Sequence, residues 1–536
     1  MRCPDLHWDH VVIGAGSSGC VVAERLSSDP ARRVLLVEAG GANASPFVTM
    51  PRGFGKLNGD PRYNWKYRAE PTGPANRREY WLRGRGLGGS GAVNGSVWVR
   101  GLPQDFDDWA EAGCTGWGWE DMRPSFEAIE DGESGRPPLG VTPHPGGSAL
   151  CDAFIASARA MGLPVMGDLN TAKGPAIGYQ PRSILRGRRR NGASLLAEAK
   201  ARRNLHVLTG AEALRITFEG RSVTGVALRD TSGDFAVAAG NVVLCAGALN
   251  TPKLLMLSGI GPAAVLGNLG IAVVADAPEV GQNLREHRLL SLQYRLRRGS
   301  SNHGFRGAGL LASVARYYAA RSGPLAQSAF EVGGFIRTMS GPGRPDAQIE
   351  FAPLSMDRST QRLTVEDHPG ALCGGYPMRP ESTGSLTLTA AAPDTPMTIS
   401  PGYLTAETDR AVSVGITRFI RALFKRPEMA AYEPQESFPG PEVDSDEGIV
   451  AAYHTRGQAG FHAACTCRMG SDARAVVDPQ TRVRGVLGLN IADISIMPAL
   501  VSGNTNAPAM AMAHRAAGLI AASQTAGAPV PVRSTG

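Results

Sequence analysis

The sequence predicts an α/β protein of two domains, a nucleotide-binding domain built on a parallel sheet and a second, mixed α/β domain with an antiparallel sheet and helices. Three observations support this fold class. A glycine-rich turn joins two apolar strands at the start of the chain, short β-rich runs recur along its length, and alternating polar and apolar runs mark a separate region after residue 288. At 536 residues, the chain is also longer than one hydrophobic core usually supports.

The first unit is an apolar strand at 11–13, a glycine-rich turn, a helical segment and a second strand that ends at Glu38. Gly14 permits the tight turn, Gly16 lets the backbone approach a pyrophosphate, and Gly19 lets the helix pack closely on the strand. The helix N-terminus offers free N–H groups to phosphates, while Glu38 can accept hydrogen bonds from a ribose. This Rossmann-like unit predicts a bound dinucleotide, but by itself it does not separate NAD from FAD.

The other strands of the nucleotide-binding sheet are expected far apart in the sequence, because each is a short, β-rich run bounded by turn residues. A segment near the C-terminus has the length and composition of a helix. We expect strands at 205–208, 223–228, 241–247 and 487–492, and the helix at 506–522.

The region from 288 to 431 has a different pattern. Alternating runs at 347–351 and 385–389 predict strands of a sheet with one covered face. A helix is expected at 411–424 and a polar return loop at 434–447. We interpret the region as a second domain laid over the nucleotide site.

The two domains are expected to interleave along the chain, with a Pro- and Gly-rich linker at 131–147. Each domain is therefore assembled from segments that are separated in sequence. The expected nucleotide-binding segments are 1–150, 191–287 and 448–536, and the expected substrate-binding segments are 151–190 and 288–447.

Composition argues against several classes of function. The net charge is +7, but the densest basic run, Arg186 to Arg190, lacks the aromatic platform of a nucleic-acid site, so we expect a solvated loop and no nucleic-acid partner. No apolar run is long enough for a transmembrane helix, and the first strand begins too early for a signal peptide. The eight cysteines lack the spacing of metal ligands or a disulfide framework, so we expect no metal, reduced thiols and a cytoplasmic location.

Four separated stretches, with one shorter match, then occur in the order in which one enzyme family carries them. They are Ile13–Gly19 with Val34–Gly40; Arg83–Gly95; Gly247–Pro262; and His462–Gly470 with Asp493–Pro498 and Ser502–Pro508; the shorter match is Val280–His287. In these stretches the chain resembles the glucose–methanol–choline (GMC) oxidoreductases, FAD-dependent enzymes that oxidise alcohols, and among them the choline dehydrogenases. The resemblance spans nearly the whole chain and favours FAD over NAD.

The resemblance also implies how FAD is held. The loop at 86–94 is expected to wrap the pyrophosphate and one edge of the isoalloxazine, Asp493 to lie near the phosphates and ribityl chain, and the backbone of 506–508 to face the flavin pyrimidine edge. The implied FAD-binding residues are Gly14, Gly16, Ser17, Ser18, Gly19, Glu38, Ala39, Arg85, Gly88, Gly89, Ser90, Asn94, Gly95, Val97, Ala213, Ala246, Gly247, Asp493, Ile494, Asn506, Ala507 and Pro508.

The loop departs from the family at two positions. Some members attach FAD covalently through a histidine immediately before the loop asparagine, whereas Val93 precedes Asn94 here. Valine cannot form that bond, so we expect FAD to be bound noncovalently. Gly91 stands where family members often carry Ser or Thr, so one contact is expected to be missing.

Oxidising a primary alcohol to the aldehyde removes a hydroxyl proton and a hydride, and the resemblance assigns the hydride to flavin N5. His462 heads the motif that resembles the catalytic segment, and a histidine is suited to accept the proton. Asn506 is expected to donate to the substrate oxygen. His454 and His514 are expected to be structural or at the surface, and His287 is expected to stabilise a domain junction rather than touch substrate.

Several alternatives stay open at this point. The flavin can be reoxidised by O2 or by another electron acceptor, and the sequence does not distinguish an oxidase from a dehydrogenase. A flavin-bearing lyase or photodecarboxylase shares the family fold without net alcohol oxidation. An NAD dehydrogenase fits the first forty residues alone. Glu331 and Phe461 are candidate substrate-lining residues, with a buried polar contact and a core aromatic as the alternatives.

Overall fold

The computed structural model describes residues 7–73, 77–133, 138–359 and 364–525. Residues 134–137 of the expected linker and 526–536 of the last expected nucleotide-binding segment lie outside the described residues.

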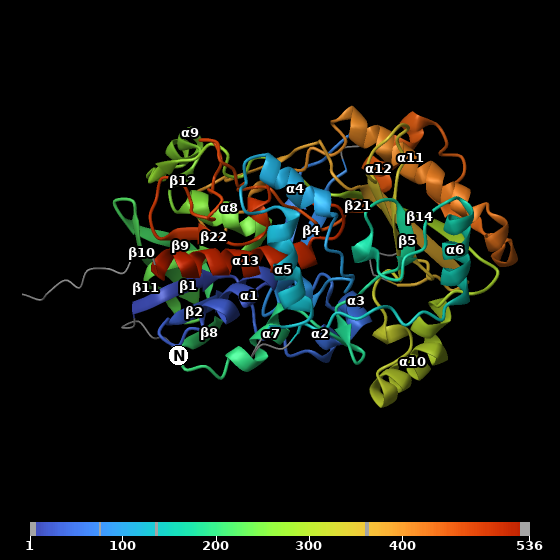
Figure 1. The fold of residues 1–536 in the computed structure, drawn as a ribbon, viewed down its shortest axis with the longest axis horizontal. Helices are drawn as coiled ribbons and strands as arrows, with labels where there is room; N and C mark the ends of the chain where they lie inside the picture. Colours follow the sequence, from blue (N-terminus) through green and yellow to red (C-terminus); the bar gives the residue numbers. More distant parts are fainter. Residues whose placement is uncertain (1–6, 74–76, 134–137, 360–363, 526–536) are drawn as a thin grey trace, which may run out of the picture.

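The first sheet contains the nucleotide-binding unit (Figure 1). Its strand order is β8-β2-β1-β11-β10-β9, and β22 pairs with β11. The pairs among β8, β2, β1, β11 and β22 are parallel, whereas β11, β10 and β9 form an antiparallel meander. Its strands are β1 (His7–Ile13), β2 (Val34–Glu38), β8 (Leu205–Thr209), β9 (Glu212–Glu219), β10 (Ser222–Asp230), β11 (Gly233–Leu244) and β22 (Leu489–Ile491).

The second sheet is antiparallel throughout and lies on the other side of the molecule (Figure 1). Its order is β20-β14-β17-β16-β15-β5, and β21 pairs with β14. Its strands are β5 (Ala176–Tyr179), β14 (Arg288–Arg295), β15 (Val332–Ile336), β16 (Ala347–Ala352), β17 (Gly370–Pro377), β20 (Gln435–Phe438) and β21 (Gln458–Ala459).

Helices cover both sheets. Next to the first sheet, α1 packs against α7 and α13, and α13 packs against α5, while α8 contacts β9. Next to the second sheet, α11 contacts β17, α6 and α12. These helices are α1 (Ser17–Leu26), α5 (Trp119–Glu130), α6 (Ala149–Ala160), α7 (Gly192–Ala199), α8 (Gly247–Leu257), α11 (Glu407–Phe424), α12 (Asp446–Arg456) and α13 (Asn506–Thr525).

The structure also contains other helices, hairpins and 3-10 turns. They include α2 (Pro46–Thr49), α3 (Phe54–Leu57), α4 (Pro103–Glu111), α9 (Ala263–Asn268), α10 (Gly307–Ala320), the hairpins β3 (Asn64–Ala69) with β4 (Glu79–Gly84), β6 (Ile184–Leu185) with β7 (Arg188–Arg189) and β18 (Ser385–Thr387) with β19 (Thr398–Ser400), the parallel pair β12 (Ile260–Gly261) and β13 (Ala275–Asp276), and the 3-10 turns η2 (Gly89–Ala92) and η7 (Ile494–Ile496).

The predicted fold class is confirmed: an α/β protein with one largely parallel sheet that carries the glycine-rich turn and a second, antiparallel sheet with helices. The strands of the first sheet fall in the three segments expected for the nucleotide-binding domain. Those of the second sheet fall in the two expected substrate-binding segments, except β21, which joins it from the last segment. The domain boundaries themselves stay a prediction.

Two local predictions are wrong. The region 434–447 is not a loop, because β20 pairs with the edge strand β14 and α12 begins at Asp446. The strand at 347–352 does not have one free face, since every one of its residues is buried. Side chains from distant segments cover the polar face of this strand, and helices cover its apolar face. The alternation of polar and apolar residues does not show that both faces are covered.

Candidate active site

The glycine-rich turn is a point where backbones touch. A Cβ at Gly14, whose φ is +96°, would lie 2.6 Å from the carbonyl oxygen of Cys245, and a Cβ at Gly19 would lie 1.8 Å from the oxygen of Gly14. A Cβ at Gly89 would lie 2.6 Å from the Cα of Gly16. Gly16 differs from these three, because its own Cβ would meet nothing closer than 4.0 Å. Packing of the fold therefore requires the other glycines. The space beside Gly16 is open, as the expected approach of a pyrophosphate requires.

Two helix N-termini meet beside this turn, and we call the site that they form with Gly16 the cradle. Helix α1 begins at Ser17 and α13 at Asn506, and Ser17 Oγ donates to Asn506 Oδ1 at 2.7 Å. A Cβ at Gly91 would lie 2.9 Å from that Ser17 Oγ, so glycine at 91 makes room for this bond. Asn506 Nδ2 is buried and has no partner among the described residues. Helix N-termini attract anions, and an unpaired amide donor beside them fits the polar parts of a bound dinucleotide.

Glu38 ties together the loops around the cradle. Its Oε2 accepts from the N–H of Ala15 at 2.9 Å, and its Oε1 accepts from the N–H groups of Gly40 and Gly86, each at 2.8 Å. A carboxylate offers about four acceptor sites. Three are therefore used within the protein, and the expected ribose contact stays a prediction that depends on the remaining one.

Asp493 joins the turn after β11 to the start of η7. Its Oδ2 accepts from Gly247 N at 2.8 Å and from Thr251 Oγ1 at 2.6 Å, while its Oδ1 accepts from Ser495 N at 2.8 Å. Burial raises the pKa of this carboxyl, and the hydrogen bonds oppose that shift. The expected site residues Ala246, Gly247 and Ile494 are thus brought to one point by Asp493.

A buried arginine holds the asparagine of the loop. Arg189 donates to Asn94 Oδ1 at 2.6 Å and to the Asn94 carbonyl oxygen at 2.5 Å, and it also donates to the carbonyl of Pro51. Burial lowers the pKa of Arg189 to about 9. The prediction that Arg186 to Arg190 form a solvated loop is therefore wrong at Arg189, whose buried side chain holds the loop that is expected to bind the cofactor.

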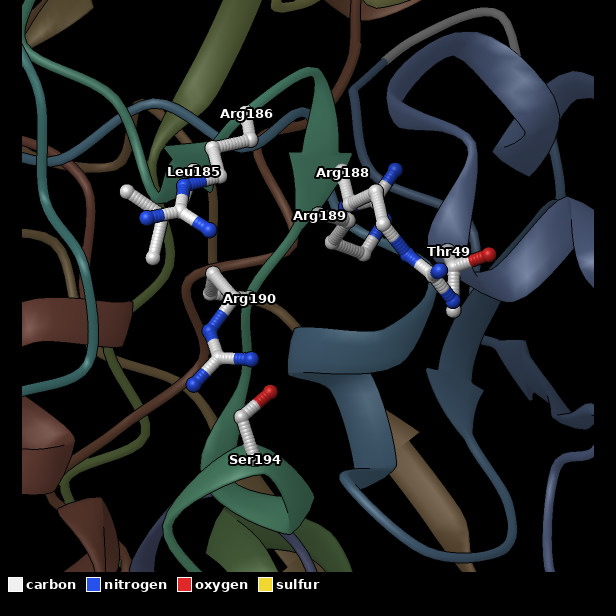
Figure 2. Close-up of a pocket in the computed structure, with 7 residues that line it drawn as sticks. All are labelled: Thr49, Leu185, Arg186, Arg188, Arg189, Arg190 and Ser194. Carbon is white, nitrogen blue, oxygen red and sulfur yellow. The ribbon is translucent and has the colours of Figure 1, made fainter. Parts of the chain in front are cut away.

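The same arginine lies at the edge of a cavity of about 310 Å³, drawn in Figure 2. His462 is not among the residues that line this cavity. The lining residues are Thr49, Leu185, Arg186, Arg188, Arg189, Arg190 and Ser194.

Other expected cofactor residues mainly support their own loops. Ser90 Oγ accepts from Gly84 N at 3.0 Å, Gly88 has a φ of +88°, and Val97 is buried beside Val99 and Leu102. Arg85 donates weakly to the carbonyls of Pro61 and Ala39, and Ser18 Oγ donates to Ala509 O. Gly95 O accepts from Ala329 N, and Ala213 lies in β9. Ala507 and Pro508 are buried in the first turn of α13.

A chain of hydrogen bonds fixes the protonation of His462. His287 Nε2 lies 2.7 Å from the carbonyl oxygen of Met378, and His287 Nδ1 lies 2.9 Å from His462 Nδ1. A carbonyl only accepts, so Nε2 of His287 must carry the hydrogen and its Nδ1 must accept in the neutral ring. His462 Nδ1 is then the donor, and His462 Nε2 carries a lone pair and no hydrogen. The arrangement makes His462 Nε2 a proton acceptor.

Burial keeps both rings neutral. The pKa of His462 is lowered well below its usual value, first by desolvation and then by the neighbouring His287 and Arg83. Desolvation also lowers the pKa of His287, to about 4. The tautomers assigned above therefore hold at neutral pH.

An asparagine stands beside the free nitrogen of His462, and it is Asn504. Asn504 Nδ2 lies 3.3 Å from His462 Nε2, and Asn504 Oδ1 accepts from Gln348 Nε2 at 3.3 Å. Tyr376 in turn donates to Gln348 Oε1 at 2.7 Å. Strands β16 and β17 of the second sheet therefore orient the amide that faces the histidine.

The backbone at His462 is also held in place. Glu286 accepts from His462 N at 2.6 Å and from Ala463 N at 2.9 Å, and Arg83 Nη2 donates to it at 3.2 Å. Phe461, directly before the histidine, has a φ of +64° and is 43% exposed, so it is not a core aromatic. A left-handed phenylalanine persists only where its surroundings impose it, and here the paired carboxylate of Glu286 fixes the residues that follow.

The structure thus places the sequence-predicted residues in different surroundings. Asn506 faces Ser17 in the cofactor cradle, and the amide beside His462 comes from Asn504, two residues earlier in the same quoted stretch. His287 lies at the junction of the two sheets, as expected, but it also contacts His462, which the sequence did not indicate. Glu331 pairs with Arg52 at 3.2 Å, as a buried polar contact would.

His454 and His514, which the sequence predicts to be structural or at the surface, have contacts elsewhere in the fold. His514 Nδ1 is 3.0 Å from Ser125 Oγ, between α13 and α5, and His454 lies on α12 against Gly73.

The residues around His462 that the sequence missed are His287, Asn504 and Gln348. His287 and Asn504 lie inside the matched stretches Val280–His287 and Ser502–Pro508, but the resemblance assigned the catalytic roles to other residues. Gln348 shows only the alternation of a strand.

Replacing His287 with Phe is expected to slow flavin reduction by an alcohol about 10- to 100-fold, because His462 loses the acceptor that fixes its tautomer. Phenylalanine keeps the stacking on Tyr376, whose ring centroid lies 4.4 Å away. His287→Gln is the control, since its amide can both donate to Met378 O and accept from His462. Anaerobic stopped-flow measures all three proteins, and equal rates in the Phe and Gln variants would show that the hydrogen-bond chain is not needed.

Comparison with known proteins shows the family of the chain. Two GMC oxidoreductase family models match residues 8–289 and 380–513. The chain belongs to the GMC oxidoreductase family. It is an FAD-dependent oxidoreductase that acts on alcohols, as the resemblance implied.

Relatives match over almost the full length. The chain is 35% identical to alcohol dehydrogenase (acceptor) of Pseudomonas putida, covering 96% of this chain and 95% of that protein. It is 37% identical to human mitochondrial choline dehydrogenase, covering 96% and 89%. Among solved structures, pyridoxine 4-oxidase from Mesorbium loti superposes with a TM-score of 0.85 at 31% identity, covering 95% and 98%. A formate oxidase superposes with a TM-score of 0.89 at 25% identity, covering 98% and 100%.

The described residues lack two further features. None of their helices is both long and apolar enough to cross a membrane. They also contain no group of three or more side chains suited to hold a metal ion.

Proposed function

We propose that this GMC oxidoreductase oxidises a primary alcohol to the aldehyde, with His462 Nε2 accepting the hydroxyl proton. The observation that carries the proposal is the hydrogen-bond chain from Met378 O through His287 to His462. It leaves a buried, neutral imidazole with its lone pair next to an amide donor, which is what removal of a hydroxyl proton requires.

Each group at the site has a separate task. His462 Nε2 accepts the proton as the carbon is oxidised. Asn504 Nδ2, 3.3 Å away, donates to the substrate oxygen and stabilises its developing negative charge, the role that the sequence gave to Asn506. Gln348 and Tyr376 keep the Asn504 amide in the required orientation. The low solvent exposure of His462 and its neighbours strengthens these interactions by excluding water.

FAD fits the cradle at the two helix N-termini, where Asn506 Nδ2 is an unpaired buried donor and the space beside Gly16 is open. Gly16, Ser17, Asn94 and Asn506 would hold it, with Glu38 offering its remaining acceptor to the ribose. Bound FAD supplies the acceptor for the hydride. Because Val93 precedes Asn94, the attachment is noncovalent.

The experiment is anaerobic mixing of the purified holoenzyme with a panel of primary alcohols while the flavin absorbance is followed. Bleaching by at least one alcohol is expected, and acid or heat denaturation is expected to release the flavin into the supernatant. Bleaching by none of them would favour the lyase or photodecarboxylase reading. Flavin that stays with the precipitated chain would contradict noncovalent binding.

The same preparation tests the electron acceptor. Peroxide formed in air, compared with reduction of an artificial dye, distinguishes an oxidase from a dehydrogenase. The relatives include both an alcohol dehydrogenase (acceptor) and a pyridoxine 4-oxidase, so neither oxidant is assigned.

A further inference from the structure

The cavity drawn in Figure 2 is lined by four arginines and by no acidic side chain. The hairpin β6–β7, the first turn of α7 and the end of α2 form it. None of Gly16, Ser17 and Asn506, which form the cradle, is among its lining residues. We call this cavity the arginine pocket, after Arg186, Arg188, Arg189 and Arg190.

Arg189 brings a buried positive charge to the pocket without a counter-charge. Its side chain is 3% exposed, and its Nη atoms donate only to neutral groups, Asn94 and the carbonyl of Pro51. Its Nε is buried and has no hydrogen-bond partner among the described residues, and no described carboxylate pairs with the guanidinium. A buried charge is costly unless it is paired. A negatively charged ligand in the pocket would supply the missing charge.

The other three arginines add to this charge. Arg186 and Arg188 are exposed, and their side chains have no hydrogen bond or ion pair with the described residues. Arg190 donates from Nε to the carbonyl of Leu139 at 2.9 Å, and its Nη atoms have no described partner. Burial and the charge of Arg188 both lower the pKa of Arg190, so the group is electrostatically repulsive by itself. An anion between these side chains would relieve the repulsion.

The arginines stand on a packed hairpin. Gly187, at its tip, has a φ of +69°, and a Cβ there would lie 2.1 Å from the carbonyl oxygen of Arg321, directly after α10. Leu185 and Arg188 are paired across the two strands. The hairpin tip is therefore held against another segment, and such fixed positions reduce the entropy that a ligand must remove on binding.

The size of the pocket indicates more than a bare oxyanion. A water molecule takes up about 30 Å³ in the liquid, so the cavity volume of about 310 Å³ corresponds to roughly ten non-hydrogen atoms. A phosphate group fills about half of this space. Leu185 offers apolar surface to a carbon chain, and Ser194 Oγ, which accepts from Asn191 N at 3.2 Å, has its own hydrogen to donate. Guanidinium groups suit phosphate oxygens, because two N–H groups can donate in parallel.

We propose that the arginine pocket binds the phosphate monoester of a small hydroxylated molecule. The phosphate lies between the guanidinium groups, and the carbon chain lies against Leu185. This site is independent of the proposed oxidation. Because Arg189 also donates to Asn94, the ligand would lie behind the loop that is expected to bind the cofactor.

Isothermal titration calorimetry of the purified holoenzyme with glycerol 3-phosphate tests the site. At about pH 7.5 the probe is mostly a dianion, and in physiological salt it is expected to bind at one site per chain with a Kd below about 1 mM. The double variant Arg186→Gln with Arg188→Gln is expected to bind at least about tenfold more weakly, because it loses charge-assisted hydrogen bonds. These two side chains have no described partner, so the fold and the flavin absorbance are expected to stay near wild type.

The matched control is the double variant Arg33→Gln with Arg221→Gln. Both residues are exposed, neither lines the pocket, and the change in net charge is the same. Salt screens exposed charges that lie away from the ligand, so the control is expected to bind within about twofold of wild type. Equal losses in the two double variants would reduce the effect to net charge and overturn the site.

The wild-type titration also decides the proposal by itself. Binding that does not saturate by about 10 mM, or that occurs only in protein freed of FAD, would overturn it. Inorganic phosphate and citrate identify the ligand class. Inorganic phosphate that binds as tightly as glycerol 3-phosphate would overturn the organic part of the ligand, and tighter binding of citrate would overturn the phosphate.

Discussion

His462→Ala is expected to slow flavin reduction by alcohol about 10²- to 10⁴-fold, the usual effect of removing a general base. The physical reason is that His462 Nε2 carries the lone pair beside Asn504, whereas His287 Nδ1 already accepts from His462 itself. Anaerobic stopped-flow on the reconstituted holoenzyme measures the rate. The flavin spectrum and the FAD content are expected to stay near those of the wild type, because no described contact joins His462 to the glycine cradle.

His454→Ala is the control for this variant. His454 is a partly buried histidine on α12 without a described contact to His462, so its removal is expected to leave the reduction rate within a few-fold of wild type. A His462 variant that reduces its flavin at nearly the wild-type rate would dismiss the assignment of the base.

Gly16→Ala is expected to weaken FAD binding by at least about tenfold while the protein without FAD keeps nearly its full stability. A Cβ at this position meets no protein atom closer than 4.0 Å, and the φ of Gly16 is −75°, which alanine adopts freely. As an N-cap, alanine costs less than about 1 kcal/mol relative to glycine. The methyl group therefore intrudes only on what lies beside the turn.

Titration of the apoprotein with FAD, followed by the quenching of flavin fluorescence, measures the affinity, and urea unfolding of the apoprotein measures the stability. Gly14→Ala is the contrasting variant, because its Cβ would lie 2.6 Å from Cys245 O at a φ of +96°, so it is expected to destabilise the fold itself. Wild-type FAD affinity in Gly16→Ala would place the cofactor elsewhere.

Sequence reasoning worked best where a glycine or a strand has a local signature. The turn from Gly14 to Gly19 and strands such as β2 and β8 were predicted because their side-chain patterns are local and complete. The prediction of family membership from four stretches is likewise confirmed by the family models. The conformation of these segments is determined by residues that are close together in the sequence.

The sequence did not predict side-chain environments that depend on residues far away in the sequence. Arg189 looked like part of a basic loop, because nothing nearby in sequence shows that Asn94 and Pro51 surround its side chain. His287 and His462 are 175 residues apart, and only the pairing of β14 with β17 and β21 brings Met378, His287 and His462 into line. The choice between Asn504 and Asn506 depends on where α13 begins, a boundary that sequence patterns place only within a few residues.

The substrate-side residues were the least predictable. Gln348 and Glu350 alternate with apolar neighbours as solvent-facing residues of a half-covered sheet would, and the sequence predicts such a strand at 347–351. In the structure both residues are buried, and Gln348 donates to Asn504, which comes from a distant part of the chain. Only a tertiary contact separates the two cases.

The central claim is that His462 Nε2 receives the proton of a carbinol held against the flavin. A crystal structure of the holoenzyme with a bound alcohol analogue tests it most directly. The account predicts that the analogue's oxygen lies about 2.6–3.2 Å from His462 Nε2, with Asn504 Nδ2 as its second partner and the flavin ring facing its carbon. An analogue oxygen bound away from His462, or an imidazole with Nε2 turned from the flavin, would contradict it.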